Sequence, residues 1–265
     1  MPKLTINDIE LYYEVQGDGI PLLLIAGLAS DSQSWQPIIG ELTSRCQVIT
    51  VDNRGVGRTS PLDVETSVHT MATDCIALVK HLGLKSLNIL GHSMGGFVAQ
   101  ECAIHYPEYV DNLILASTSS YNSRRNNDLF SNWACSLEAG LDLKIWFRSI
   151  FYWILSERFF EDEKAIEDAV QFEVDYPYPP SSVAFRKQVD AIVEFNCTDK
   201  LHTIAARTLV IGGNEDLLFP VQMCKDLAGR IPGAVFTVQD NAAHSIYLEP
   251  PHVFMGTVLN FLFNP

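Results

Sequence analysis

The sequence predicts a doubly wound α/β fold, in which helices flank a mostly parallel β-sheet and a helical cap is inserted. Short apolar runs recur without polar alternation, as is typical of parallel strands that are buried on both faces. Helical segments separate these runs up to about residue 120 and again from residue 204. Residues 121–203 show helical periodicity and no convincing strand. We therefore predict a core made of residues 1–120 and 204–265, with residues 121–203 as the cap.

The predicted strands follow one another in a regular order. Leu4–Ile6 and Leu11–Val15 flank the polar dipeptide Asn7-Asp8 and predict an opening hairpin. Six apolar runs then predict the main sheet, at residues 22–25, 48–51, 87–90, 113–116, 208–211 and 235–238.

Helical signals lie between these runs. The clearest helix repeats apolar residues at helical spacing from Val68 to Leu82 and stops at Gly83, which suits a left-handed C-cap. A second runs from Met94 to His105 and is closed by a proline. A terminal helix is expected to start at residues 249–251.

The predicted cap is rich in aromatic residues. Most of these rings are expected to pack the cap against itself and the sheet, but a cap also lines the cavity that it covers, so some should contact ligand. The most apolar stretch, residues 143–155, is interrupted by Lys144 and Arg148. It is open to two interpretations, a buried cap helix, which we favour, and the contact segment of a membrane-surface lipase.

Composition narrows the classes of function. Of the 265 residues 47% are hydrophobic, enough for a closed core, and the formal net charge is −14. Such a surface repels phosphate backbones and anionic membranes, so we expect neither nucleic acid nor membrane as a partner. The six cysteines are scattered without metal-ligand spacing, and we interpret them as buried free thiols in a reducing compartment. Without a signal peptide or a membrane-spanning run, the chain is expected to be cytoplasmic, as a monomer or homodimer.

The strongest chemical signal is the motif Gly91-His92-Ser93-Met94-Gly95. It lies between the strand-like run 87–90 and a helix, which places Ser93 on a sharp strand-to-helix turn. Such a turn needs small residues two positions before and after the serine, because a Cβ there would collide with the neighbouring backbone. Gly91 and Gly95 meet that demand, so Ser93 is the candidate nucleophile.

A serine nucleophile needs a base within hydrogen-bond reach and an acid that orients the base. In an open parallel sheet such groups collect in loops at the carboxyl ends of strands. Of the seven histidines, His244 differs from the others because it lies between the last strand run and the terminal helix, and we expect it to be the base. His92 lies in the turn itself, but its position next to Ser93 is expected to point its side chain elsewhere.

Asp216 is the candidate acid, because it follows the run 208–211 at the carboxyl end of that strand. Glu215 and Asp240 remain alternatives. Glu215 would point away from the direction of its neighbour, and Asp240 belongs to its strand rather than to the loop of His244. The expected role of Asp216 is to hold the imidazole in the productive tautomer and to stabilise the imidazolium.

The oxyanion that forms during attack needs preorganised donors. We expect the backbone N–H groups of Met94, at a helix amino terminus, and of Leu28, after the first central strand, to supply them. The residues expected to contact substrate are Gly27, Leu28, Met94, Trp146, Tyr152 and Leu217. This chemistry requires no metal and no organic cofactor.

With these residues in place, the chain resembles the α/β-hydrolase superfamily over almost its whole length, in particular its compact capped serine esterases and lactonase-like members. The resemblance rests on the chain order Ser93, Asp216, His244, on the elbow around Ser93 and on residues 52–60, which look like the family's D-x-R-G-x-G-x-S loop. It implies that this loop shapes the rim of the active site rather than performing chemistry. Relatives commonly carry His-Gly before the oxyanion-hole residue, where this chain has Ala26-Gly27, so the side-chain anchoring of that loop is expected to differ.

We therefore expect a serine hydrolase that cleaves a small or medium carboxylic ester or lactone through an acyl-enzyme. The aromatic cap and acidic surface favour neutral, largely apolar substrates. One alternative is an enol-lactonase or carbon–carbon bond hydrolase acting on a carboxylated ring-cleavage product, which needs a cation near Ser93. The cap offers Arg124, Arg125, Arg148 and Arg158. Another alternative is a slow-turnover, ligand-sensing protein of the same fold. Because the nucleophile position holds Ser rather than Asp, the resemblance argues against dehalogenase and epoxide-hydrolase chemistry.

Overall fold

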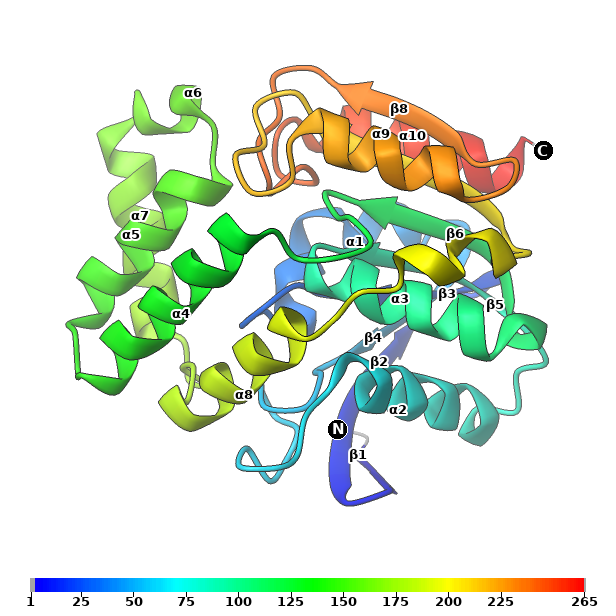
Figure 1. The fold of residues 1–265 in the computed structure, drawn as a ribbon, viewed down its shortest axis with the longest axis horizontal. Coiled ribbons are helices and arrows are strands. Elements are labelled where there is room, and N and C mark those ends of the chain that lie inside the picture. Colours follow the sequence, from blue (N-terminus) through cyan, green and yellow to red (C-terminus); the bar gives the residue numbers. More distant parts are fainter. Residues whose placement is uncertain (1–2, 265) are drawn as a thin grey trace.

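The computed structural model describes residues 3–264 and contains one eight-stranded sheet within them (Figure 1). The strands are β1 (Lys3–Ile6), β2 (Ile9–Gln16), β3 (Ile20–Ile25), β4 (Cys46–Val51), β5 (Leu87–His92), β6 (Val110–Ala116), β7 (Arg207–Gly213) and β8 (Val235–Gln239). Their order across the sheet is β1-β2-β4-β3-β5-β6-β7-β8. The β1–β2 and β2–β4 pairs are antiparallel, and the other five pairs are parallel. The predicted doubly wound, mostly parallel sheet is confirmed.

The centre of the sheet contains a switch point. β3 pairs with β4 on one side and with β5 on the other, so the chain reverses its winding direction between them. The register aligns Ile25 with Gly91 and His92 with Ala116, which brings the ends of these strands level. Ligand sites in open α/β sheets form in the crevice outside the carboxyl ends of the strands at such a point.

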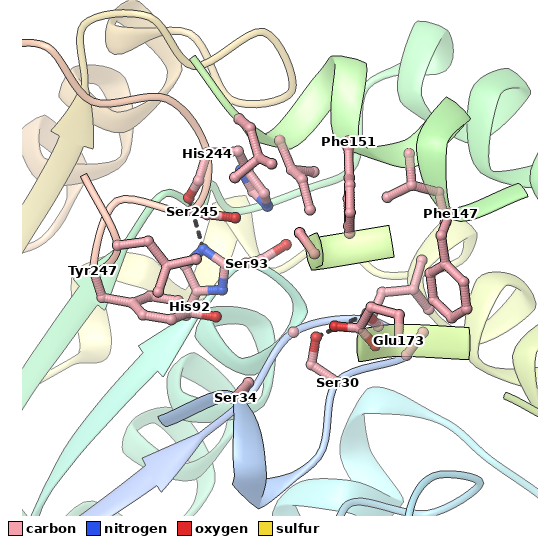
Figure 2. Close-up of a pocket in the computed structure, with 18 of the residues that line it drawn as sticks. Ser30, Ser34, His92, Ser93, Phe147, Phe151, Glu173, His244, Ser245 and Tyr247 are labelled. Atoms are coloured by element: carbon pink, nitrogen blue, oxygen red, sulfur yellow. Dashed lines mark hydrogen bonds between the residues drawn. The ribbon is translucent and has the colours of Figure 1, made fainter. Parts of the chain in front are cut away.

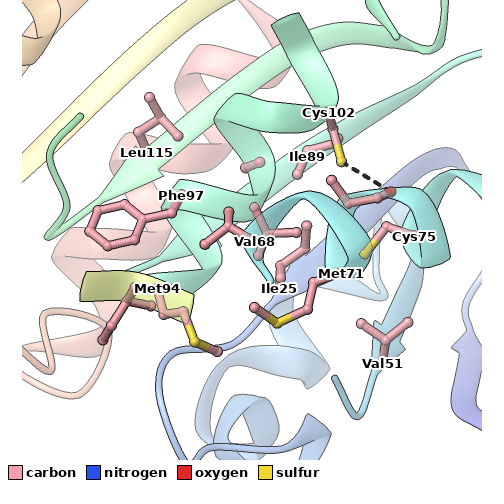
Figure 3. Close-up of a cluster of buried hydrophobic side chains, with 14 of the residues drawn as sticks. Ile25, Val51, Val68, Met71, Cys75, Ile89, Met94, Phe97, Cys102 and Leu115 are labelled. Carbon is pink, nitrogen blue, oxygen red and sulfur yellow. Dashed lines mark hydrogen bonds between the residues drawn. The ribbon is translucent and has the colours of Figure 1, made fainter. Parts of the chain in front are cut away.

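Helices cover both faces of the sheet. α2 (Val68–His81), α3 (Met94–His105) and α9 (Val221–Arg230) pack on one face, and α1 (Gln36–Leu42) and α10 (Pro251–Phe263) pack on the other. Figure 3 shows Met71 and Cys75 of α2 beside Ile25 and Ile89 of the strands. α2 starts with a capping box of Ser67 and Thr70 and stops before Gly83, whose φ is +69°, so its predicted end is confirmed.

Five α-helices lie between β6 and β7, and we call them, with the loops that join them, the helical insertion. They are α4 (Arg124–Glu138), α5 (Leu143–Ile154), α6 (Glu157–Phe160), α7 (Glu163–Asp175) and α8 (Ser182–Val193). The two ends of the insertion meet, because the N–H of Cys197 donates to the carbonyl of Ser120 at 3.0 Å. Figure 1 shows these helices gathered beyond the carboxyl ends of the strands. Residues 143–155 form α5 and its cap residue, and no helix in the described part of the chain is long and apolar enough to cross a membrane.

Two expectations about burial were wrong. Val235 and Val238 of β8 are 52% and 39% exposed, because β8 lies at the edge of the sheet and is paired on one side only. Cys135 is exposed on α4, where its Sγ accepts from Arg186, whereas the other five cysteines are buried. An apolar run or an isolated cysteine in a sequence does not show whether a neighbouring element will cover it.

Candidate active site

Ser93 joins β5 to α3 in a strained backbone conformation, with φ 55° and ψ −121°. A Cβ on Gly91 would lie 2.3 Å from the carbonyl oxygen of Gly95, and one on Gly95 would lie 2.0 Å from the carbonyl oxygen of Ile25. Both glycines are therefore required by close backbone approach, as expected from the sequence. The turn is also bonded in place, because the N–H of Ser93 donates to the carbonyl of Ala116 at 3.0 Å.

The structure brings His244 and Asp216 into contact. His244 Nδ1 lies 3.0 Å from Asp216 Oδ2, and both side chains are almost fully buried. The other carboxylate oxygen of Asp216 accepts from the N–H groups of Leu218 and Phe219 at 2.8 and 2.9 Å. Burial disfavours the charged carboxylate, but the charge of the imidazole and these hydrogen bonds outweigh it, so the pKa of Asp216 is lowered. Asp216 is thus held as an anion that fixes the imidazole.

The alternative acids do not take this place. Asp240 is exposed, Glu215 is half-buried, and neither side chain contacts His244 within the described chain.

His92 is a residue whose position the sequence reasoning predicted wrongly. Its side chain does not point away but lines the same cavity as Ser93, and its Nε2 lies 2.8 Å from the carbonyl oxygen of His244 (Figure 2). A carbonyl only accepts, so His92 Nε2 carries the proton and donates it to this bond. Burial, and then the charge of His244, lower the pKa of His92 to about 3. His92 therefore stays neutral near pH 7 and braces the backbone of the candidate base.

Ser93 and His244 open into one cavity of about 430 Å³ (Figure 2). The loop after β3 passes close to the nucleophile, because a Cβ on Gly27 would lie 3.2 Å from Ser93 Cβ. Gly27 and Leu28 line the cavity, and Met94 starts α3, where the first N–H groups have no intrahelical partner. The roles of Leu28 and Met94 as oxyanion donors stay predictions that this geometry permits.

The loop after β3 is held from the helical insertion by Gln188 of α8. The Oε1 of Gln188 accepts from the N–H of Ala29 at 3.1 Å, and its Nε2 donates to the carbonyl of Arg54 at 2.7 Å. Gln188 is 1% exposed. Because Ala29 directly follows Leu28, this side chain ties the expected donor loop to both the insertion and the loop after β4. Sequence reasoning missed Gln188, since a glutamine on a predicted cap helix carries no signal of its target.

The loop of residues 52–60 is held together by its own polar contacts. The buried carboxylate of Asp52 accepts from the N–H of Ser32 at 2.9 Å and from the N–H and Nε of Arg58, both at 2.8 Å. Neither Asp52 nor Arg58 is among the described residues that line the cavity. This loop is bonded to the segment after β3 through Ser32, whose Oγ also accepts from Arg58 at 2.6 Å.

The loops of His244 and Asp216 are also bonded to the helical insertion. Buried Glu249 accepts from the Oγ of Ser156 at 2.6 Å and from the N–H of Ala243 at 3.2 Å. Asn126 of α4, which is fully buried, donates through Nδ2 to the carbonyl of Leu218 at 2.7 Å. The insertion therefore contacts the loops of both candidate catalytic residues as well as the loop after β3.

The insertion supplies most of the aromatic lining of the cavity. Trp146 lines it as expected, but Met94, Leu217 and Tyr152 do not. Tyr152 is 55% exposed and stacks on Phe160 outside, and Leu217 is 51% exposed. The side chain of Met94 is buried in the core instead. These three side chains therefore do not line the cavity, because sequence position alone does not show which face of a cap helix or loop turns inward; contact with substrate through the backbone N–H of Met94 stays a prediction.

No arginine or lysine lines the cavity within residues 3–264. Arg125 donates to the carbonyl of Leu217, and Arg158 donates to Oδ1 of Asn241 at 2.6 Å. The carboxylated-substrate hypothesis needed one of four cap arginines near Ser93, and the geometry does not support it.

One group of described residues has ligand atoms close enough to share a metal ion: His69 on α2, with Glu101 and His105 on α3. Glu101 already lies 3.0 Å from Nδ1 of His69 and 3.4 Å from Nε2 of His105, and the amine of Lys200 lies 3.5 Å from that same Nε2. None of these residues lines the cavity of Ser93. We interpret the group as a polar link between two helices.

Comparison with known proteins agrees with this architecture. Residues 20–251 match a family model described as the alpha/beta hydrolase fold. A Caulobacter protein (strain K31) named as a carbamate hydrolase is 27% identical over 258 residues, which are 95% of each chain. The crystal structure of a non-heme bromoperoxidase homologue from Mycobacterium tuberculosis superimposes with a TM-score of 0.86 at 26% identity, covering 98% of this chain and 96% of that one. A thermophilic esterase from Thermogutta terrifontis has the same TM-score and 26% identity, covering 99% and 98%.

Proposed function

Since the chain belongs to the α/β-hydrolase fold family, we propose that this hydrolase cleaves small or medium carboxylic esters or lactones through a Ser93 acyl-enzyme. The observation that carries the proposal is the 3.0 Å contact between His244 and Asp216, with His244 and Ser93 lining one apolar cavity. In this proposal, residues 121–203 are the cap that covers the bound acyl group.

The proposed reaction gives each of these groups a defined role. His244 directs Nδ1 to Asp216, so Nε2 is free to take the proton of Ser93 Oγ as that oxygen attacks the substrate carbonyl. Asp216 stabilises the imidazolium that forms. The N–H groups of Leu28 and Met94 donate to the oxyanion, and His244 returns the proton to the leaving alcohol. Water, deprotonated by His244, then attacks the acyl-enzyme and restores Ser93.

A panel of chromogenic esters of graded acyl length, several lactones and an aryl carbamate tests the proposal. The carbamate belongs in the panel because one relative is named as a carbamate hydrolase. We expect turnover of esters or lactones that falls by several orders of magnitude in Ser93→Ala, since nucleophile removal leaves only the oxyanion hole and binding. Undiminished turnover in a folded Ser93→Ala variant would refute the assignment of Ser93 as nucleophile. Turnover of the carbamate alone would show that the substrates are carbamates rather than esters or lactones.

A slow-turnover sensing role makes a different kinetic prediction. Such a protein would release one equivalent of chromophore in a burst and then nearly stop, because its acyl-enzyme persists. Steady-state turnover after the burst favours the hydrolase.

A further inference from the structure

The cavity at Ser93 adjoins a second, smaller one of about 90 Å³, and Glu173 of α7 lines both. Glu173 is the only acidic side chain that lines the larger cavity within the described residues. Figure 2 shows it beside Ser30 and Phe147, on the side of the cavity away from His244. The cavity of Ser93 therefore has aromatic walls and a carboxyl group on the side away from His244.

The carboxyl of Glu173 has no partner of its own. No hydrogen bond or ion pair to it occurs in residues 3–264, although the side chain is half-buried. Burial, and then the neighbouring charge of Asp31, raise the pKa of Glu173 to about 7. A carboxyl in such a position lacks the cation that normally accompanies a buried anion.

The surroundings of Glu173 add negative charge and aromatic faces. Asp31 lines the smaller cavity, where it accepts a hydrogen bond from the hydroxyl of Tyr176, and burial raises its pKa too. Arg58 lies 3.7 Å from Asp31, but its shorter contact, at 2.8 Å, is with Asp52, and no arginine or lysine in the described part of the chain lines the smaller cavity. Phe172 and Tyr178 complete the aromatic lining of this smaller cavity. Carboxylates combined with aromatic faces are the groups that bind organic ammonium ions.

We propose that the smaller cavity is a subsite for a protonated amine, so that the preferred substrates are esters or lactones whose acyl chain carries an ammonium group bound by Glu173. The proposal rests on the proposed hydrolase function and refines its substrate class. It replaces the expectation of neutral substrates, which considered only the apolar lining and the surface charge. The net charge of −14 would also favour the approach of cations over that of anions.

Matched substrates test the subsite. The nitrophenyl ester of 6-aminohexanoate ends in an ammonium group where that of heptanoate ends in a methyl group. The nitrophenyl monoester of adipate ends in a carboxylate and serves as the anionic comparison. Measurements at about pH 8 keep a carboxyl of pKa about 7 ionised. We expect the ratio of kcat/KM for the ammonium ester to that for the alkyl ester to fall on the order of tenfold or more in Glu173→Gln, mainly through KM. Amino acyl chains from pentanoate to octanoate locate the best length.

Glu167→Gln is the matched control, because Glu167 is exposed on the same helix and the substitution changes the net charge equally. The ratio should stay at its wild-type value in this variant. An unchanged ratio in Glu173→Gln, or an equal change in both variants, would overturn the subsite.

A binding measurement separates this proposal from the hydrolase assignment. Calorimetric titration of the Ser93→Ala chain with hexylammonium chloride needs no turnover. Weaker binding in the Ser93→Ala, Glu173→Gln double variant supports the subsite even if no ester is hydrolysed. If hexylammonium binds both chains equally, or binds neither, the subsite is refuted whatever the esterase assays show.

Discussion

Replacing Gln188 with leucine should weaken catalysis from a position outside the cavity lining. The substitution keeps the volume of the buried side chain but removes its hydrogen bonds to the N–H of Ala29 and the carbonyl of Arg54. Leaving a buried polar group without a hydrogen bond costs about 1–3 kcal/mol. Only the carbonyl of Arg54 is left in that state, because Ala29 is half-buried and its N–H can bond to water instead. We therefore expect a loss of about 1–3 kcal/mol in the free energy of unfolding.

The larger effect of Gln188→Leu should be on kcat. Loss of a whole oxyanion donor costs roughly 100- to 1000-fold in kcat, and a loosened Leu28 loop should lose part of that, on the order of tenfold. KM should change less, because Gln188 does not line the cavity. Steady-state kinetics together with urea unfolding measure both quantities. Gln171→Leu, at an exposed position on α7, is the control and should change neither.

The reasoning fails if Gln188→Leu lowers the stability but leaves kcat unchanged, since Gln188 would then be a packing residue with no influence on the donor loop. A rise in KM at constant kcat would also contradict the reasoning.

Three further outcomes are expected. Asp216→Asn should lower kcat by about 10³- to 10⁴-fold with the fold retained, because the amide favours the wrong tautomer of His244, and a stopped assay on the best ester measures it. The pKa of His92 is about 3 in the folded chain and about 6.5 in the unfolded chain, so the unfolded chain binds the proton first as the pH falls. The free energy of unfolding should therefore drop by several kcal/mol between these two pH values. His92→Gln should flatten this slope of unfolding free energy against pH, and an equally steep slope would exclude His92 as its source. Gly95→Ala should abolish soluble, folded protein in expression tests, because its Cβ would lie 2.0 Å from the carbonyl oxygen of Ile25.

The sequence predicted those features that depend on local pattern. Buried parallel strands and the glycine demand of a tight turn can be read along the chain, which is why the sheet and the elbow at Ser93 were predicted correctly. The position of Asp216 followed from the same rule that active-site loops lie at strand ends. Its contact with His244 is therefore a consequence of topology rather than of any local signal.

Contacts made across the fold could not be predicted in this way. His92 was expected to point away from the site because its neighbour points in, but it turns under the backbone of His244, which lies 152 residues later in the chain. Tyr152 was expected to contact substrate as one of the aromatic residues of the cap, yet α5 turns Trp146 inward and leaves Tyr152 outside. The position of His92 depends on where a distant loop packs, and that of Tyr152 depends on how an insertion helix is rotated. Periodicity gives the faces of a helix without saying which one meets the core.

The helical insertion is hydrogen-bonded to the loop after β3, the loop of Asp216 and the loop of His244. These bonds link substrate preference, which the insertion is proposed to determine, to the catalytic rate, which is proposed to depend on the three loops. Gln188 holds the loop after β3, Asn126 holds the carbonyl of Leu218 beside Asp216, and Ser156 is joined through Glu249 to the loop of His244. An insertion that only covered the substrate would need none of these buried contacts. Because each contact fixes a backbone segment adjacent to a candidate catalytic group, a change in the insertion that reshapes the cavity is expected to shift the proposed oxyanion donors and the candidate base as well. Substitutions that redesign the cavity are therefore expected to alter kcat together with KM, whereas Glu173, which has no bond to any of these loops, can change the substrate class without that coupling.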